Sequence, residues 1–75
     1  MLPTLLIVDD EKSTRDGLRG ALEEEFDVYT AASAAEAMTI LKSESIQLLL
    51  TDLRLGGESG MELLERALAL PEPPV

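Results

Sequence analysis

The chain has 75 residues and neither cysteine nor histidine, and its 6 basic and 15 acidic side chains give a formal net charge of −9. This length allows at most one small domain of marginal stability, and the composition excludes disulfides and the usual zinc ligands. The negative charge argues against nucleic acid or an anionic membrane as a direct partner. No apolar run approaches the ~20 residues of a membrane-spanning helix, and the N-terminus lacks a signal-peptide pattern, so we expect a cytoplasmic protein.

The N-terminal part predicts a buried strand followed by a helix. Residues 4–8 are apolar and partly β-branched in a run too short for a helix, which is typical of a strand buried on both faces. The acidic triplet of residues 9–11 follows this run. Ser13 and Asp16 then mark an N-cap and the start of a helix. We expect its inward side chains to be Leu18, Ala21, Leu22 and Phe26.

The middle of the chain predicts an edge strand and a second helix. Polar and apolar residues alternate over residues 27–31, a pattern that suits the edge of a sheet. Ser33 and Glu36 have the spacing of a capping box, which opens a helix. We expect that helix to end near residues 43–45. Four of its side chains should face the core, namely Ala37, Met38, Ile40 and Leu41.

The last third predicts another buried strand and a third helix. Residues 46–51 form the second strongly apolar run, and Asp52 follows it directly. Gly56-Gly57 predicts a turn, and Ser59 with Glu62 predicts a further capping box. The helix that this box opens should stop before the prolines at positions 71, 73 and 74. We expect it to bury Met61, Leu64 and Leu68.

Strand and helix thus alternate three times, an order that favours an α/β fold with a parallel, doubly wound sheet. Ligands of such sheets bind beyond the carboxyl ends of the strands, which is where Asp9, Asp10 and Asp52 fall. If the two apolar strands are neighbours, Asp52 shares one pocket with Asp9 or Asp10. Carboxylates held so close repel one another unless a cation neutralises them, and a set of oxygen ligands suits Mg²⁺.

Each carboxylate by itself also has a plainer interpretation. An aspartate after a strand is often only the cap or turn former of the next helix, and Glu11 fits a solvated surface residue. Acidic ends on the two most apolar strands would, however, add repulsion without a stabilising purpose unless an ion or a reaction uses them. The conjunction of the two strand ends therefore favours a functional site.

Three segments, residues 5–11, 48–55 and 60–64, resemble the receiver domain of bacterial two-component response regulators. The resemblance runs along the whole chain and implies a flavodoxin-like sheet in a signal-transduction protein of the phosphorelay type, most similar to receivers of transcription regulators. A receiver has five βα units, so we expect residues 1–75 to be its N-terminal part, truncated to three units and ending at the approach to strand four. The hydroxyl and lysine residues of later strands would then be missing, which implies impaired phosphotransfer.

The resemblance also implies a role for each acidic residue. Asp9 and Asp10 would bind Mg²⁺, and Asp52 would be both a metal ligand and the phosphoacceptor, taking a phosphoryl group from a sensor histidine kinase. The backbone carbonyl of Arg54 would complete the metal site. The chain would then be a phosphoacceptor switch and not an enzyme that acts on other substrates.

Two alternatives stay open. A small Mg²⁺-dependent phosphatase with an aspartate nucleophile would want a second carboxylate just after it, but Leu53 and Arg54 follow Asp52. The chain could also be a structural fragment that oligomerises without phosphotransfer. In the strand order 2-1-3-4-5, three strands alone leave residues 46–51 as an uncharged, apolar edge. We therefore expect a homo-oligomer.

Overall fold

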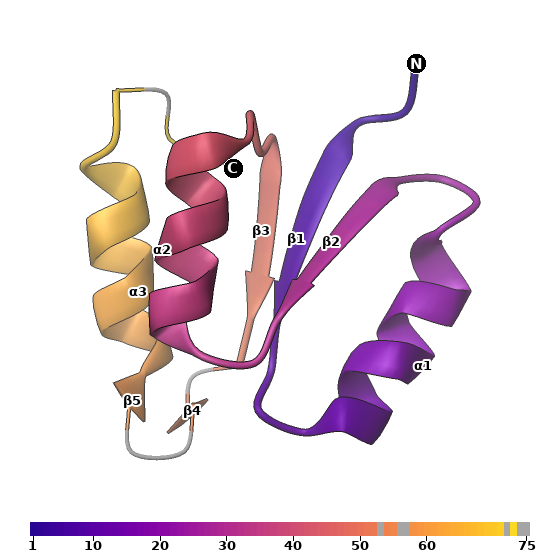
Figure 1. Ribbon diagram of the computed structural model, residues 1–75, viewed down its shortest axis with the longest axis horizontal. Helices are drawn as coiled ribbons and strands as arrows, with labels where there is room; N and C mark the ends of the chain where they lie inside the picture. Colours follow the sequence, from indigo (N-terminus) through magenta and orange to yellow (C-terminus); the bar gives the residue numbers. More distant parts are fainter. Residues whose placement is uncertain (53, 56–57, 72, 74–75) are drawn as a thin grey trace.

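The computed structural model describes residues 1–52, 54–55, 58–71 and 73. The strands β1 (Thr4–Val8), β2 (Asp27–Ala31) and β3 (Leu48–Thr51) form one parallel sheet in the order β2-β1-β3, so that β1 is the central strand (Figure 1). This confirms the predicted α/β fold with a parallel sheet, whereas the turn expected at Gly56-Gly57 lies outside the described residues. The elements in chain order are β1 (Thr4–Val8), α1 (Lys12–Leu22), β2 (Asp27–Ala31), α2 (Ala34–Ser43), β3 (Leu48–Thr51), β4 (Arg54–Leu55), β5 (Glu58–Ser59) and α3 (Gly60–Leu68).

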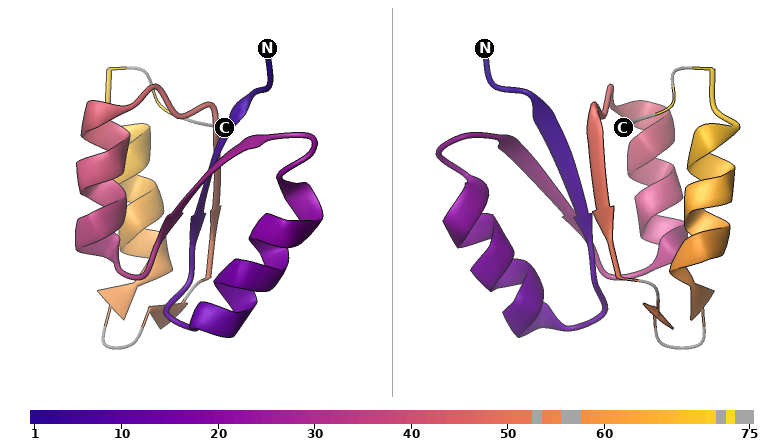
Figure 2. Two further views of the ribbon diagram at one scale, coloured as in Figure 1. Left: turned by 45° about the vertical axis from the view of Figure 1, so that its right-hand side comes forward. Right: turned by 180° about the vertical axis from the view of Figure 1, so that it is seen from behind.

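Helices lie on both faces of the sheet, as in a doubly wound fold. Helix α1 covers one face, and α2 and α3 lie side by side on the other (Figures 1 and 2). Right-handed crossovers explain this division, because the chain moves from β1 to β2 and then back past β1 to β3. No helix in the described part of the chain is long and apolar enough to cross a membrane.

The main core lies between the sheet and the pair α2 and α3. Leu6 and Val8 of β1 point to this side and are almost completely buried against residues of both helices. Side chains alternate along a strand, so Ile7 lies on the opposite face, under α1. That face is less well covered, since α1 has no buried residue of its own. The core is therefore asymmetric about the sheet.

The inward side chains expected for α1 are only partly right. Leu18, Leu22 and Phe26 are half-buried, but Ala21 is exposed. Helix α1 packs mainly over β1 and β2, and its Ala21 lies outside the half-buried side. In α2, by contrast, the predicted inward residues Ala37 and Leu41 are buried.

Strand β3 is shorter and more exposed than the fully buried strand predicted over residues 46–51. It begins at Leu48, while Ile46 is buried ahead of it. Leu50 is 44% exposed although its partner in the sheet, Ile7, is only 1% exposed. The reason is that β3 is an edge strand, while α1 packs mainly over β1 and β2. The expectation that this strand forms an edge is confirmed.

Helix α3 buries a different stripe from the predicted one. Met61 and Leu68 are 52% and 66% exposed, and Leu64 is half-buried. The buried stripe begins one residue earlier in the helix. Leu63 and Ala67 of that stripe belong to the core cluster that also contains Ala37 and Leu41 of α2. The buried residues are Gly60, Leu63 and Ala67.

Serine caps begin two of the helices, as predicted. The Ser33 hydroxyl accepts a hydrogen bond from the Glu36 backbone N–H at 3.2 Å at the start of α2. The Glu36 carboxylate accepts from the N–H of Ala32, at 2.7 Å. At the start of α3, Ser59 accepts from the Met61 backbone N–H at 3.2 Å. These bonds satisfy backbone donors that the first turn of a helix leaves without partners.

Candidate metal centre

The pairing of β1 with β3 brings the two acidic strand ends together. Val8 lies opposite Thr51 in the register of these strands, so Asp9 and Asp52 follow the carboxyl ends of two neighbouring strands. The backbone N–H of Asp52 donates to the Val8 carbonyl at 3.0 Å, and the N–H of Asp9 donates to the Ala31 carbonyl at 3.1 Å. Both aspartates are therefore fixed at the backbone by the sheet itself.

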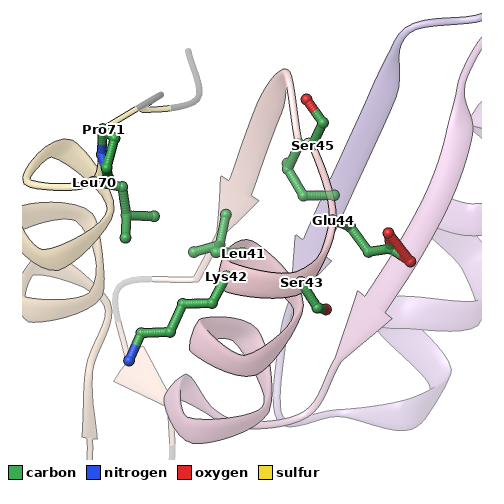
Figure 3. Close-up of a pocket in the computed structure, with 8 residues that line it drawn as sticks. Leu41, Lys42, Ser43, Glu44, Ser45, Leu70 and Pro71 are labelled. Carbon is green, nitrogen blue, oxygen red and sulfur yellow. The ribbon is translucent and has the colours of Figure 1, made fainter.

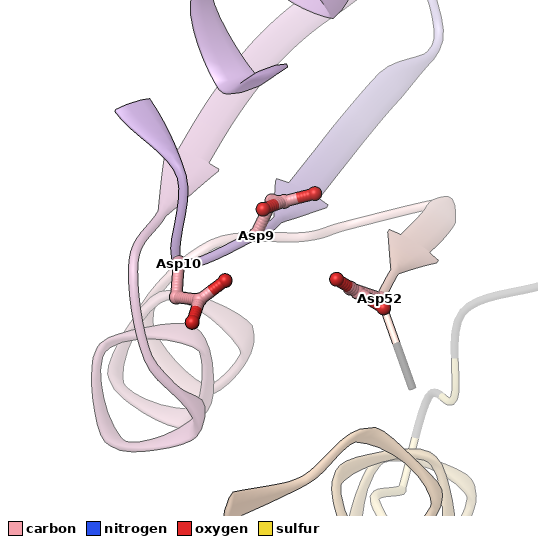
Figure 4. Close-up of side chains that lie close together, drawn as sticks. All are labelled: Asp9, Asp10 and Asp52. Carbon is pink, nitrogen blue, oxygen red and sulfur yellow. The ribbon is translucent and has the colours of Figure 1, made fainter. Parts of the chain in front are cut away.

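The carboxylates of Asp9, Asp10 and Asp52 form one cluster. One oxygen from each of the three side chains lies within 4.8 Å of the others. Asp9 is half-buried, whereas Asp10 and Asp52 are exposed. Figure 4 shows the side chains of Asp10 and Asp52 pointing toward each other from the loop after β1 and the end of β3. The structure thus confirms that Asp52 shares a pocket with Asp9, and Asp10 lies close to both. Their roles as ligands and phosphoacceptor stay predictions.

The cluster has the donor set that a hard divalent cation uses. All three side chains offer oxygen, and their exposure leaves room for the water molecules that Mg²⁺ usually keeps. With neither cysteine nor histidine in the chain, softer metals lack their preferred ligands. The residues present therefore fit Mg²⁺.

The loop that carries Asp9 and Asp10 is held by several hydrogen bonds. Oδ1 of Asp9 accepts from the backbone N–H of Glu11 at 2.9 Å, and the Asp9 carbonyl accepts from Nη1 of Arg15 at 2.8 Å. Helix α1 begins at Lys12 with Glu11 as its N-cap, and no side chain caps it. The predicted Ser13 cap is wrong, because the turn made by Asp9 starts the helix before Ser13 is reached.

Arg54, the expected source of a carbonyl ligand, begins β4. Its backbone pairs with Ser59 of β5 in a short antiparallel ladder that connects the acidic edge of the sheet to α3. This ladder did not follow from the sequence, because two residues a strand give no periodicity. The proposed role of the Arg54 carbonyl stays a prediction.

An apolar hollow of about 230 Å³ borders the acidic cluster. Ile7, Leu18 and Leu50 line it between the sheet and α1, and Asp9 and Asp52 lie at its edge. Sequence reasoning did not predict this hollow, because it depends on how α1 packs against the sheet. Asp52 therefore stands between an apolar surface and the other two carboxylates.

A larger hollow, of about 430 Å³, lies at the opposite end of the strands from the acidic cluster (Figure 3). Leu41, Ile46 and Leu70 supply its apolar lining, where the ends of α2 and α3 meet. Its charged residues do not converge, because Lys42 and Glu44 point in different directions in Figure 3. We therefore assign the chemistry to the acidic cluster and not to the larger hollow.

Comparison with known proteins identifies the family of this acidic α/β domain. The response regulator receiver domain matches residues 5–75. The chain belongs to the response regulator receiver family. Among curated relatives, the hydrogenase transcriptional regulatory protein HoxA of Cupriavidus necator is 44% identical over 62 residues, which cover 83% of this chain and 13% of HoxA. Receiver domains of this family are signalling switches in two-component systems.

Solved receiver structures have the same fold. The chemotaxis response regulator CheY4 of Vibrio cholerae superimposes with a TM-score of 0.91 over 96% of this chain and 61% of its own, at 22% identity, a likeness of fold alone. The MaeR response regulator bound to beryllium trifluoride gives a TM-score of 0.87 at 32% identity, over 97% of this chain and 62% of its own. This chain thus spans less than two thirds of the length of each of these proteins.

Proposed function

We propose that this receiver accepts a phosphoryl group on Asp52, with Mg²⁺ held by Asp9, Asp10, Asp52 and the backbone carbonyl of Arg54. The observation that carries the proposal is the approach of three carboxylate oxygens to within 4.8 Å at the ends of two adjacent parallel strands. Such an arrangement lies where doubly wound sheets bind their ligands. It is also costly in repulsion unless a cation is bound.

The transfer of a phosphoryl group to Asp52 requires little of the protein besides the correct positioning of the reacting groups. A carboxylate oxygen of Asp52 attacks phosphorus, the bond from phosphorus to its donor breaks, and an acyl phosphate forms. Asp52 is exposed, so a phosphodonor has access to it. Bound Mg²⁺ would supply neutralising charge for the phosphoryl oxygens. Asp9, half-buried and fixed by the sheet, would hold its carboxylate in place without reorganisation.

The partner that fits this chemistry is a sensor histidine kinase, whose phosphorylated histidine would be the donor. Neither lysine of the chain is placed to donate a hydrogen bond to the oxygens of a phosphoryl group on Asp52. Lys12 donates to Asp16 at 2.7 Å, and Lys42 lines the larger hollow at the far edge of the sheet. Loss of one hydrogen-bond donor to the charge that develops on the phosphoryl oxygens in the transition state typically lowers the rate about 10²–10³-fold. We therefore expect phosphorylation of this chain by itself to be slow and the phosphorylated form to be scarce.

Mass spectrometry after incubation with acetyl phosphate tests this proposal. We expect a small, Mg²⁺-dependent phosphorylated fraction that disappears in Asp52→Asn. Asp27→Asn is the matched control, because Asp27 is an exposed aspartate at the start of β2, paired with Thr4 at the opposite edge of the sheet. Equal modification of wild type and Asp52→Asn would contradict the proposal.

Beryllium trifluoride provides a second test that does not depend on a reaction rate. It is bound to the MaeR response regulator in the solved structure of that protein. A ¹⁹F signal for bound fluoride that needs both Mg²⁺ and Asp52 would support the same site here. A signal that persists in Asp52→Asn would place the anion elsewhere.

We also propose that the isolated chain associates with a second copy through the edge of β3. Strand β3 pairs with β1 alone in the described part of the chain, and residues 48–51 contain no charge or proline. Such an edge is a template for pairing. The exposed Leu50 would be buried in the contact, next to the apolar hollow.

A further inference from the structure

Arg15 connects helix α1 to the acidic loop. Its Nη1 donates to the carbonyl oxygen of Asp9 at 2.8 Å, in a partly buried hydrogen bond. The backbone N–H of the same residue donates to the Glu11 carbonyl at 3.1 Å, in the first turn of α1. Arg15 therefore belongs to the helix through its backbone and reaches back across the loop with its guanidinium.

The bond from Arg15 completes the fixation of Asp9. The Asp9 N–H is held by the Ala31 carbonyl, and Oδ1 of its side chain accepts from the Glu11 N–H. The guanidinium holds the carbonyl, which belongs to the peptide unit that joins Asp9 to Asp10. The orientation of that peptide unit determines the position of the Asp10 backbone, and with it the position from which the Asp10 side chain extends. A cation beside the loop also offsets part of the repulsion among the three carboxylates.

Helix α1 needs such a connection more than the other helices do. None of its residues is buried, and only part of one side, including Leu18 and Leu22, is half-buried against the sheet. Elements with few buried contacts open more easily than the rest of a domain. The bond between Arg15 and Asp9 is thus a link between a weakly docked helix and the acidic cluster.

We infer that Arg15 is a positioning residue for the metal site and couples cation binding to the docking of α1. The inference rests on the proposed function, because it assumes that the acidic cluster binds Mg²⁺. By linkage, if docking of α1 favours the metal, the metal must favour docking of α1 by the same factor. Residues that orient ligands from behind typically change metal affinity about 10–100-fold when removed.

Calorimetric titration of the 75-residue chain with Mg²⁺ provides the first test. We expect Arg15→Gln to bind about tenfold more weakly than wild type. Arg15→Lys, which keeps a charged donor, should recover part of that loss. Arg19→Gln is the matched control, since Arg19 is exposed on the same helix and its ion pair is with Glu23, at 4.0 Å. We expect it to bind like wild type.

Amide hydrogen exchange provides a second readout, which needs no variant. Saturating Mg²⁺ should slow exchange in α1 of the wild-type chain, and the same residues should respond less in Arg15→Gln. If Arg15 acted on stability alone, α1 of Arg15→Gln would exchange faster than in the wild type but would slow by the same factor in Mg²⁺. Exchange in α1 of the wild type that does not change with Mg²⁺ would overturn the coupling, even if Arg15→Gln failed to fold.

The outcomes separate this inference from the proposed function. Absence of Mg²⁺ binding by the wild type would refute the proposed site itself. Equal Mg²⁺ affinities of wild type and a folded Arg15→Gln would overturn the role of Arg15 and leave the proposed site intact. If Arg15→Gln is unfolded by circular dichroism, Arg15→Lys decides, and a folded Lys variant with binding weaker than wild type would support the inference.

Discussion

Replacing Leu63 with alanine tests the stripe through which α3 packs on the core. Leu63 is completely buried, at 0% exposure, in the cluster that also contains Leu6 and Val8. Leucine-to-alanine changes at such sites cost about 2–5 kcal/mol, because apolar contact is lost and a cavity is left. A chain of this length has a total stability of only about 4–11 kcal/mol, at 0.05–0.15 kcal/mol per residue. We therefore expect Leu63→Ala to lose a large share of its stability.

Urea unfolding followed by circular dichroism measures the effect. With a slope of about 1 kcal/mol per molar urea, the midpoint should fall by about 2 M or more, or the variant should be unfolded without urea. Leu68→Ala is the matched control on the same helix, because Leu68 is 66% exposed and surface changes are usually within about 0.5 kcal/mol. Equal losses in the two variants, or a larger loss in Leu68→Ala, would refute the packing of α3 described above.

Three further predictions follow from the caps, the surface charges and the sheet edge. Ser33→Ala should lower the unfolding free energy by about 1 kcal/mol, because it removes the cap of α2, whereas Ser43→Ala at the end of the same helix should have little effect in the same urea assay. The hydrogen bond from Lys12 lowers the pKa of Asp16 from its ordinary value of 3.8, so the bond stabilises the fold above pH 3.8 and is lost as the pH falls through the lowered pKa. Asp16→Asn should therefore be slightly less stable than the wild type at pH 7. Unfolding curves should show this difference disappearing when the pH falls below the lowered pKa. Light scattering after size-exclusion chromatography should find a homodimer or larger species that strengthens with salt, because salt screens the charge of −9, and Leu50→Lys should weaken it; a wild-type monomer at tens of micromolar, unchanged by salt, would contradict association through β3.

Local patterns were sufficient to predict the elements whose environment is simple. The apolar run of β1 has helices on both sides, and the alternation in residues 27–31 matches an edge strand half open to solvent. The acidic cluster was predicted on the condition that the two apolar strands are neighbours, because the carboxyl ends of parallel strands lie at the same end of a sheet. The structure meets that condition, since β1 pairs with β3 and Val8 lies opposite Thr51.

The features that sequence reasoning missed depend on contacts between elements. Periodicity gives two apolar stripes on α3, and only packing in the folded chain shows that Leu63 and not Met61 belongs to the core. The exposure of Leu50 follows from where α1 stops covering the sheet, which is a property of packing and not of β3. The start of α1 shifted because the side chain of Asp9 forms the preceding turn, a local bond that competes with the Ser13 cap.

Titration calorimetry with Mg²⁺ on the wild type, Asp10→Asn, Asp52→Asn and Asp27→Asn tests the proposed metal site most directly. The three clustered carboxylates should give weak, saturable binding to the wild type, with Mn²⁺ tolerated and Zn²⁺ not preferred. We predict that binding is lost or strongly weakened in Asp10→Asn and Asp52→Asn and kept in Asp27→Asn, which changes an exposed carboxylate at the opposite edge of the sheet. Equal heats from the wild type and Asp10→Asn would contradict the proposal that the acidic cluster is the metal site.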